Sequence, residues 1–414
     1  MTPSCSSLLM LPTELKEQIT EYLDLEALEA CRLVDQDLKE HSLRSFQFYF
    51  NTVTTTLHPD SLQRLINISN YQDFTNAIHI IDIKPEDRHE GILEDLNSTT
   101  LKWILQSGHM LPPYSYQYTR SYLSALASGT CTALLKRALR NCSYLEDVTF
   151  SWQPSSKVAI SSELLTWNRN ELDHLTRMQS TVLGAIIDSG VKLRTLMWCS
   201  SSERWGALTP KILEIGSGLM SRLRPALENL KDLDLCLQAE INVPRNAAFL
   251  TQLLELTPNL SHLILSLDTN VYQERNYLLE GMCQATVLPS LCEFELNCNG
   301  FYSTELALRF LRKHASTLKC LVLRDAEYPF DPVGERLETV IIPMLKTLRR
   351  NFRLETIQFG IDEEQRVEKT MAKLWPIEQL EESKEGVKNV LTIAIEAFEA
   401  MLLYYVATGV TFIT

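Results

Sequence analysis

Basic residues are scarce in this chain of 414 residues. It has 39 Lys and Arg against 52 Asp and Glu, which gives a formal net charge of −13. A surface that binds a nucleic-acid backbone needs clustered Lys and Arg to neutralise the phosphates. The charge balance therefore argues against direct binding of nucleic acid.

Long apolar runs are missing as well. No segment reaches the ~20 apolar residues that a membrane-spanning helix needs. The closest is 390–414, but it contains Glu396 and Glu399, and only 15 residues follow Glu399. We interpret it as a packed C-terminal helix with a short extended end, in preference to a membrane anchor. No basic residue precedes the short apolar run 8–11, so no secretory signal peptide and no membrane association are predicted.

The ten cysteines lack the spacing of a metal site. No two stand as C-x-x-C, and no His lies at ligand spacing from the nearest group, Cys283, Cys292 and Cys298. We interpret the cysteines as free thiols and predict no metal and no other cofactor. Free thiols without a signal peptide indicate a reducing compartment, the cytoplasm or the nucleus.

Catalytic signatures are missing too. Gly216 and Gly218 lack the Lys-Ser or Lys-Thr pair of a phosphate-binding loop, and there is no G-x-S-x-G elbow. The eight His lie singly. Acidic pairs such as Asp232 and Asp234 share a strand face, and we interpret them as solvated surface in preference to an acid–base pair. The sequence predicts a protein that is not an enzyme.

What is present begins with a helical pattern in residues 1–50. Pro12 suits the first position of a helix, where a missing N–H costs nothing. Leu15, Ile19 and Leu23 then recur at a spacing of four residues, which places them on one helix face. The pattern predicts a short amphipathic helix.

Two further helices are expected in the same region. Asp24 is a plausible N-cap for a helix in which Leu28, Cys31 and Val34 share a face. A third helix is expected over 35–46. Three short helices bury little surface, so the module gains by packing on the next domain or on a partner.

The segment 11–34 resembles the F-box motif. That motif runs Leu-Pro-x-Glu-Leu, an aliphatic residue four positions later, an aromatic-Leu-Asp group, a Leu, and then Arg-Leu-Val. The residues of this chain in register with it are Leu11, Pro12, Glu14, Leu15, Ile19, Tyr22, Leu23, Asp24, Leu28, Cys31, Arg32, Leu33 and Val34. The chain departs from the family at Asp35, Gln36 and Asp37, where small, basic or aromatic residues are usual. The alternative is an unrelated helical cap.

F-box modules bind the adaptor Skp1, which joins a cullin–RING ubiquitin ligase. Carried over by position, the resemblance implies that the Skp1-binding residues are Leu11, Pro12, Leu15, Ile19, Leu23, Leu28, Cys31 and Val34. Some of these must instead hold the helices together, and the sequence does not divide the two sets. The implied function is the substrate-recognition subunit of an SCF-type ligase. The unusual segment 35–37 motivates an alternative, a binding scaffold that assembles no active ligase.

A pattern of apolar-x-x-apolar-x-apolar recurs eight times in the rest of the chain. Its apolar triplets are Ile78/Ile81/Ile83, Leu145/Val148/Phe150, Leu193/Leu196/Trp198, Leu230/Leu233/Leu235, Leu260/Leu263/Leu265, Leu291/Phe294/Leu296, Leu318/Leu321/Leu323 and Leu354/Ile357/Phe359. The last six begin 37, 30, 31, 27 and 36 residues apart, longer than the roughly 20 to 29 of regular leucine-rich repeats.

Helical patterns lie between these triplets. The expected helices are 120–140, 171–189 with Gly190 after its end, 245–256, a helix capped by Ser303 or Thr304 that reaches His314, and 336–350. Helix and strand in alternation are typical of a solenoid with a parallel inner sheet. A compact α/β domain is the competing architecture, but it predicts strands that are apolar on both faces.

The resulting fold class is α+β to α/β, a three-helix F-box module followed by an irregular leucine-rich-repeat array. The expected divisions are 1–50, a linker strand and helix at 51–70, the array at 71–375, and a C-terminal helix and tail at 376–414. This order resembles fungal F-box proteins with divergent leucine-rich repeats.

The polar residues between the apolar strand positions line the opposite, concave face of the expected array. They are Asp82, Lys84, Asp147, Asp232, Asp234, His262, Glu293, Glu295 and Arg324. Six acids against two bases predict a surface that steers a basic protein target. A merely solvated acidic strand face is the alternative.

Overall fold

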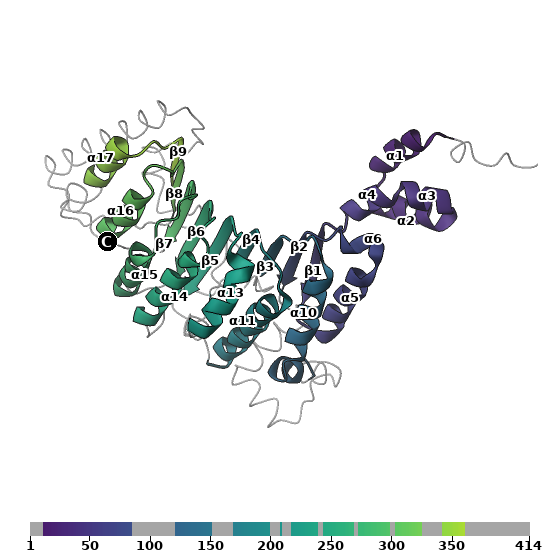
Figure 1. Cartoon of the computed structure of the whole chain (residues 1–414), viewed down its shortest axis with the longest axis horizontal. Coiled ribbons are helices and arrows are strands. Elements are labelled where there is room, and N and C mark those ends of the chain that lie inside the picture. Colours follow the sequence, from purple (N-terminus) through teal and green to yellow (C-terminus); the bar gives the residue numbers. More distant parts are fainter. Residues whose placement is uncertain are drawn as a thin grey trace, which may run out of the picture. The chain divides into compact units, whose positions relative to one another are not determined.

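The computed structural model describes residues 11–84, 121–150, 169–198, 208, 217–238, 243–268, 272–298, 303–324 and 342–360. The chain is a mixed α/β protein in which helices alternate with parallel strands (Figure 1). It divides into two compact units, the first made of 1–150 and 181–191 and the second of 151–180 and 192–414. The division falls inside the predicted repeat array. The expected C-terminal helix and tail lie outside the described residues.

The first unit begins with short helices. They are α1 (Thr13–Glu21), α2 (Leu25–Val34), α3 (Gln36–His41) and α4 (Leu43–Phe48). The single helix expected over 35–46 is therefore two helices. Ser42 separates them, and its hydroxyl donates to the carbonyl of Lys39 at 3.3 Å, a local bond that competes with helix continuation.

Aspartates cap two of these helices. The carboxylate of Asp24 accepts from the backbone N–H of Ala27 at 2.8 Å, which confirms the predicted N-cap of α2. Asp35 accepts in the same way from the N–H of Asp37 at 2.8 Å and begins α3. Asp35, one of the residues at which the chain departs from the F-box motif, is thus a helix cap.

The remainder of the first unit contains three parallel strands with helices. Its elements are β1 (Thr52–Thr56), α5 (Pro59–Asn70), α6 (Gln72–Thr75), β2 (Ile80–Lys84), α10 (Thr130–Asn141) and β3 (Asp147–Phe150). The strands pair in chain order, with Val53, Ile81 and Val148 in register. The helix expected over 120–140 is interrupted at Gly129, whose φ of +77° suits glycine and ends the preceding turn.

The second unit repeats the helix–strand order. Its elements are β4 (Thr195–Trp198), α13 (Ser217–Leu227), β5 (Asp232–Gln238), α14 (Val243–Glu255), β6 (His262–Asp268), α15 (Tyr272–Gln284), β7 (Glu293–Cys298), α16 (Thr304–Lys313), β8 (Cys320–Arg324), α17 (Ile342–Asn351) and β9 (Thr356–Gly360). The residues of α11 (Arg169–Ser189) are divided between the two units. Strands β4 to β9 pair in chain order and in parallel, and helices α13 to α17 cover one face of this sheet (Figure 1).

The predicted apolar triplets form the core beneath the helices. Every triplet side chain that the structure describes is buried. The side chain of Phe359 lies outside the described part. The second residue of each triplet is aligned across strands β5 to β8, with Leu233, Leu263, Phe294 and Leu321 in successive register. The strand predictions are confirmed because the alternation of apolar and polar residues matches the two faces of each strand.

Helix ends also agree with the sequence pattern. Gly190 follows α11 with a φ of +76°, as expected of a residue just beyond a helix C-terminus. Ser303 accepts from the N–H of Leu306 at 3.3 Å and caps α16. His314 follows α16 and is buried, with the N–H of Leu288 donating to its Nε2 at 3.1 Å. It is a core histidine with satisfied hydrogen bonds.

Candidate functional site

Helix α1 turns its apolar side to solvent. Leu15 is 44% exposed and Ile19 is 38% exposed. Lys16 and Thr20, which follow them about 100° further round the helix, are only 6% and 2% exposed. A helix in a small folded domain ordinarily buries its apolar stripe against the core. The apolar stripe of α1 is thus available for contact with another surface.

Polar contacts hold α1 in this orientation. The ammonium of Lys16 lies 2.5 Å from a carboxylate oxygen of Asp37, whose other oxygen lies 3.2 Å from Nε2 of His41. The hydroxyl of Thr20 lies 3.3 Å from that of Ser45. The hydrogen bond from Lys16 lowers the pKa of Asp37 below its ordinary value. Asp37, part of the departure from the family motif, therefore anchors the helix that carries the apolar stripe.

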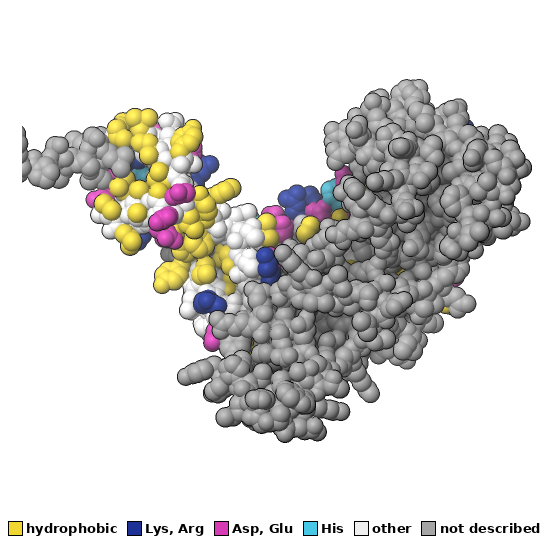
Figure 2. Space-filling view, turned by 180° about the vertical axis from the view of Figure 1, so that it is seen from behind, with side chains coloured by type: hydrophobic (Ala, Val, Ile, Leu, Met, Phe, Trp, Pro, Cys, Tyr) yellow, Lys and Arg dark blue, Asp and Glu magenta, His cyan; other side chains and the backbone are white. Residues whose placement is uncertain are grey.

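Other apolar side chains of the module are exposed too. Tyr22 and Leu33 are each 89% exposed, and Val34 is 76% exposed. Figure 2 shows hydrophobic side chains gathered over the N-terminal helices. Exposed apolar groups in such number mark interaction surfaces. We call Leu15, Ile19, Tyr22, Leu33 and Val34 the exposed apolar set.

The structure divides the predicted Skp1-binding residues. Pro12, Leu15, Ile19 and Val34 are exposed, and Leu11, Leu23 and Cys31 are half-buried. Leu28 is fully buried, so it belongs to the core of the module and not to its surface. Leu28, Cys31 and Val34 were expected to share one face of α2. Exposure increases along that face from Leu28 to Val34, because only the first part of α2 is packed against the module. Leu33 and Tyr22, matched to the motif but not predicted as contacts, are the most exposed.

Aromatic contacts join the N-terminal helices α1 to α4 to helix α6 of the same unit. The guanidinium of Arg32 lies 4.4 Å from the ring centre of Phe46. Phe46 and Phe50 contact Phe74 of α6, with ring centres 5.8 and 4.5 Å away. Arg32 also lies 3.9 Å from a carboxylate oxygen of Asp73. Arg32 therefore makes contacts within the first unit that link α2 to α4 and α6.

A second candidate surface is the polar face of β5, β6 and β7, which we call the polar strand face. The strand register places Asp232 beside His262 and His262 beside Glu293. Nδ1 of His262 contacts the carboxylate of Asp232, and Nε2 lies 3.5 Å from Oε1 of Glu293. Three of the predicted target-binding residues therefore form one connected group.

Asp234 does not fit the prediction of an open contact residue. It is only 8% exposed, and its register neighbours on the same face are the apolar residues Met197 and Ile264. Burial raises the pKa of Asp234 to about 7, and the nearby charge of Glu295 adds to the effect. Its carboxyl group offers a target little surface.

The remaining predicted contact residues are spread over both units. In the first unit, Asp82 and Asp147 are half-buried, and the ammonium of Lys84 lies 3.4 Å from Asp82. In the second, Glu295 is half-buried on β7. Arg324 ends β8, and its side chain lies outside the described residues. The acidic group around His262 is the part of the predicted surface that the structure assembles.

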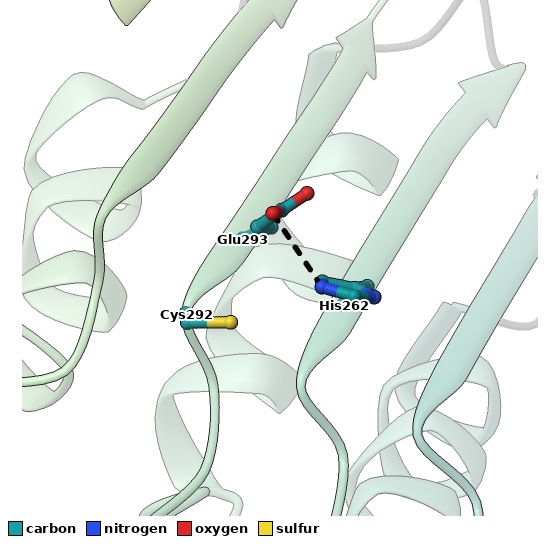
Figure 3. A group of neighbouring side chains, drawn as sticks. All are labelled: His262, Cys292 and Glu293. Atoms are coloured by element: carbon teal, nitrogen blue, oxygen red, sulfur yellow. Dashed lines mark ion pairs between the residues drawn. The ribbon is translucent and has the colours of Figure 1, made fainter. Parts of the chain in front are cut away.

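Cys292 adds a thiol to this group. A ring nitrogen of His262, Sγ of Cys292 and a carboxylate oxygen of Glu293 all lie within 4.8 Å of one another (Figure 3). Burial raises the pKa of the Cys292 thiol, the opposite of what a nucleophilic thiolate needs. A search for ligands at short spacing misses this group, because 30 residues separate His262 from Cys292 along the chain. Aligning the strands of successive repeats is the signal that finds it.

No family model matches the chain, and no curated protein matches its sequence. Among the helices that the structure describes, none is long and apolar enough to cross a membrane.

Proposed function

We propose that this chain is the substrate-recognition subunit of an SCF-type cullin–RING ubiquitin ligase, in which helices α1 to α4 act as an F-box that binds Skp1. The observation that supports this most is the orientation of α1. The helix exposes Leu15 and Ile19 and buries Lys16 and Thr20. Apolar anchors four residues apart are the pattern by which a helix is recognised in an apolar groove.

The role of Asp35 and Asp37 favours this proposal over an unrelated helical cap. These residues depart from the family motif, but both act within the module, as a helix cap and as the partner of Lys16. Through Lys16, Asp37 holds α1 in the orientation that presents Leu15 and Ile19 to solvent. The departure therefore leaves the proposed docking face intact.

The chain itself performs no bond chemistry in this proposal. The module holds the adaptor, and the strands hold a protein target. Holding both raises the effective concentration of target lysines near the ubiquitin-loaded enzyme. Asp232, Glu293 and Glu295 on the polar strand face favour a target with a basic surface.

The test is the affinity of the purified full chain for Skp1. We expect the double variant Leu15→Glu/Ile19→Glu to bind at least about tenfold more weakly, because burying the exposed part of each side chain contributes about 0.6–1.2 kcal/mol and a buried glutamate charge adds a desolvation cost. Its unfolding midpoint should change little, since both side chains are exposed in the free chain.

Val287→Glu is the matched control, because Val287 is an apolar residue of the second unit that is 55% exposed. It should leave Skp1 affinity unchanged. Equal affinity of the wild-type chain and the double variant would contradict the proposed docking face. A folded wild-type chain that does not bind Skp1 would refute the proposal as a whole.

A further inference from the structure

The backbone fixes the geometry of the group around His262. The N–H groups of Cys292 and Glu293 both donate to the carbonyl of Ser261, at 2.9 and 3.0 Å. These bonds hold the start of β7 against the start of β6. His262 and Glu293 are consequently paired in the strand register, and Cys292 lies one residue before β7, tied to Ser261 by its own N–H.

The contact with the carboxylate of Asp232 orients the ring of His262. An ionised carboxylate can only accept a hydrogen bond, so Nδ1 carries the proton in this contact. In the neutral ring, the lone pair of Nε2 then faces Oε1 of Glu293 at 3.5 Å. Two acceptors in that position repel each other unless a proton or a metal cation lies between them.

Cys292 favours the metal cation. Its Sγ lies in the same group as the His262 ring and the Glu293 carboxylate (Figure 3). Without a metal the thiol donates to the carbonyl of Ser261 at 3.4 Å, a weak bond that coordination of the thiolate would replace. Imidazole, thiolate and carboxylate together are the donor set that zinc accepts in tetrahedral sites.

We propose that His262 Nε2, Cys292 Sγ and the Glu293 carboxylate bind a zinc ion on the polar strand face, with Asp232 as the residue that orients His262. A carboxylate that accepts from the second nitrogen of a metal-binding histidine is a common arrangement in zinc proteins. The thiol loses its proton on binding, so the two anionic ligands balance the charge of the ion. Glu295, two residues along the same face, adds to the negative potential that attracts a cation.

Three ligands from the chain leave the fourth zinc position open. The side chains of His262 and Glu293 are 42% and 55% exposed, so solvent or a bound protein can reach the ion. A side chain of a bound protein could then coordinate the zinc ion, a contact that acidic residues alone do not provide. This inference stands on its own and does not depend on the binding of Skp1.

The test is titration of the reduced full chain with cobalt(II), followed by displacement with zinc. We expect one high-affinity cobalt per chain, with tetrahedral visible bands and a thiolate-to-cobalt charge-transfer absorption. Cys292→Ser should abolish the charge-transfer absorption. His262→Ala should weaken binding at least about tenfold, and Asp232→Asn about 10- to 100-fold, the usual effect of removing an orienting partner.

Cys31→Ser and His79→Ala are the controls, because both residues lie in the first unit and outside the group. They should leave both the cobalt spectrum and the affinity unchanged. Circular dichroism of each variant separates loss of the site from loss of the fold. Failure of the wild-type chain to bind a stoichiometric metal, or a charge-transfer absorption that persists in Cys292→Ser, would overturn the proposal, whatever the result with Skp1.

Discussion

Lys16 and Asp234 are charged residues in buried positions that the hydrophobic pattern does not predict. Lys16 lies 2.5 Å from the carboxylate of Asp37, so its charge has a counter-ion. Asp234 has the like charge of Glu295 nearby. A buried charge stabilises a fold only when it is well paired. Lys16 therefore helps to position α1, and Asp234 lowers the stability of the second unit at neutral pH.

We predict that Asp234→Asn stabilises the second unit more at pH 8 than at pH 5. The pKa of Asp234 rises from 3.8 to about 7 on folding, so the native state binds the proton more tightly than the unfolded state. Ionisation of Asp234 therefore lowers the free energy of unfolding. This loss is absent below about pH 4 and is complete above about pH 7. A difference of about 3 pKa units corresponds to roughly 4 kcal/mol as an upper value, of which less than half applies at pH 5.

Urea unfolding of the two proteins at both pH values measures this difference. Glu255→Gln is the control for the removal of one carboxylate from the second unit, because Glu255 is exposed at the end of α14. The account of Asp234 fails if its Asn variant is no more stable than the wild type at pH 8.

The helices and strands could largely be predicted from the sequence. The apolar triplets mark β2 to β9, and Gly190 and Ser303 mark helix ends, because each signal depends only on local residues. The breaks at Ser42 and Gly129 were missed, since a helical pattern continues through both. The group of His262, Cys292 and Glu293 was missed because repeats of unequal length hide the register that brings it together.

Helices α14 and α15 pack unusually closely at Gly281, and we predict that Gly281→Ala destabilises the second unit. A Cβ at this position would lie 2.5 Å from the carbonyl oxygen of Ala247, which is backbone and cannot turn aside. The hydroxyl of Thr251 also bonds the carbonyl of Gly281 at 2.7 Å. Overpacking typically lowers the free energy of unfolding by about 1–3 kcal/mol, and we expect the upper part of that range here. The higher helix propensity of Ala offsets only roughly 1 kcal/mol of this loss, so the net effect is destabilising.

Thermal and urea unfolding test this prediction, with Gly184→Ala as the matched helical control. The nearest atom to a Cβ at Gly184 is the methyl group of Thr132 at 3.3 Å, a side chain that can shift. That variant should be neutral or slightly stabilising. Equal effects at the two glycines would show that the packing of α14 on α15 does not require glycine.

At the scale of the whole molecule, the sequence is more informative about the proposed adaptor-binding segment than about the proposed target-binding surface. Docking on an adaptor depends on one contiguous segment, so the register of residues 11–34 suffices to suggest it. It does not reveal that Leu28 is core and Leu33 is surface, because that depends on how α1 to α4 pack. A target surface draws single residues such as Asp232 and Glu293 from separate strands, and no short motif encodes such a set.

The measurement that tests the central claim most directly is affinity purification of the full chain from cells, with the wild type compared to Leu15→Glu/Ile19→Glu. The account predicts that the wild type recovers Skp1 and a cullin, that the variant loses both, and that other partners bound through the strands are retained. Recovery of Skp1 without a cullin would favour a scaffold that assembles no ligase. Recovery of neither by a folded wild-type chain, or of both by the variant, would contradict the account.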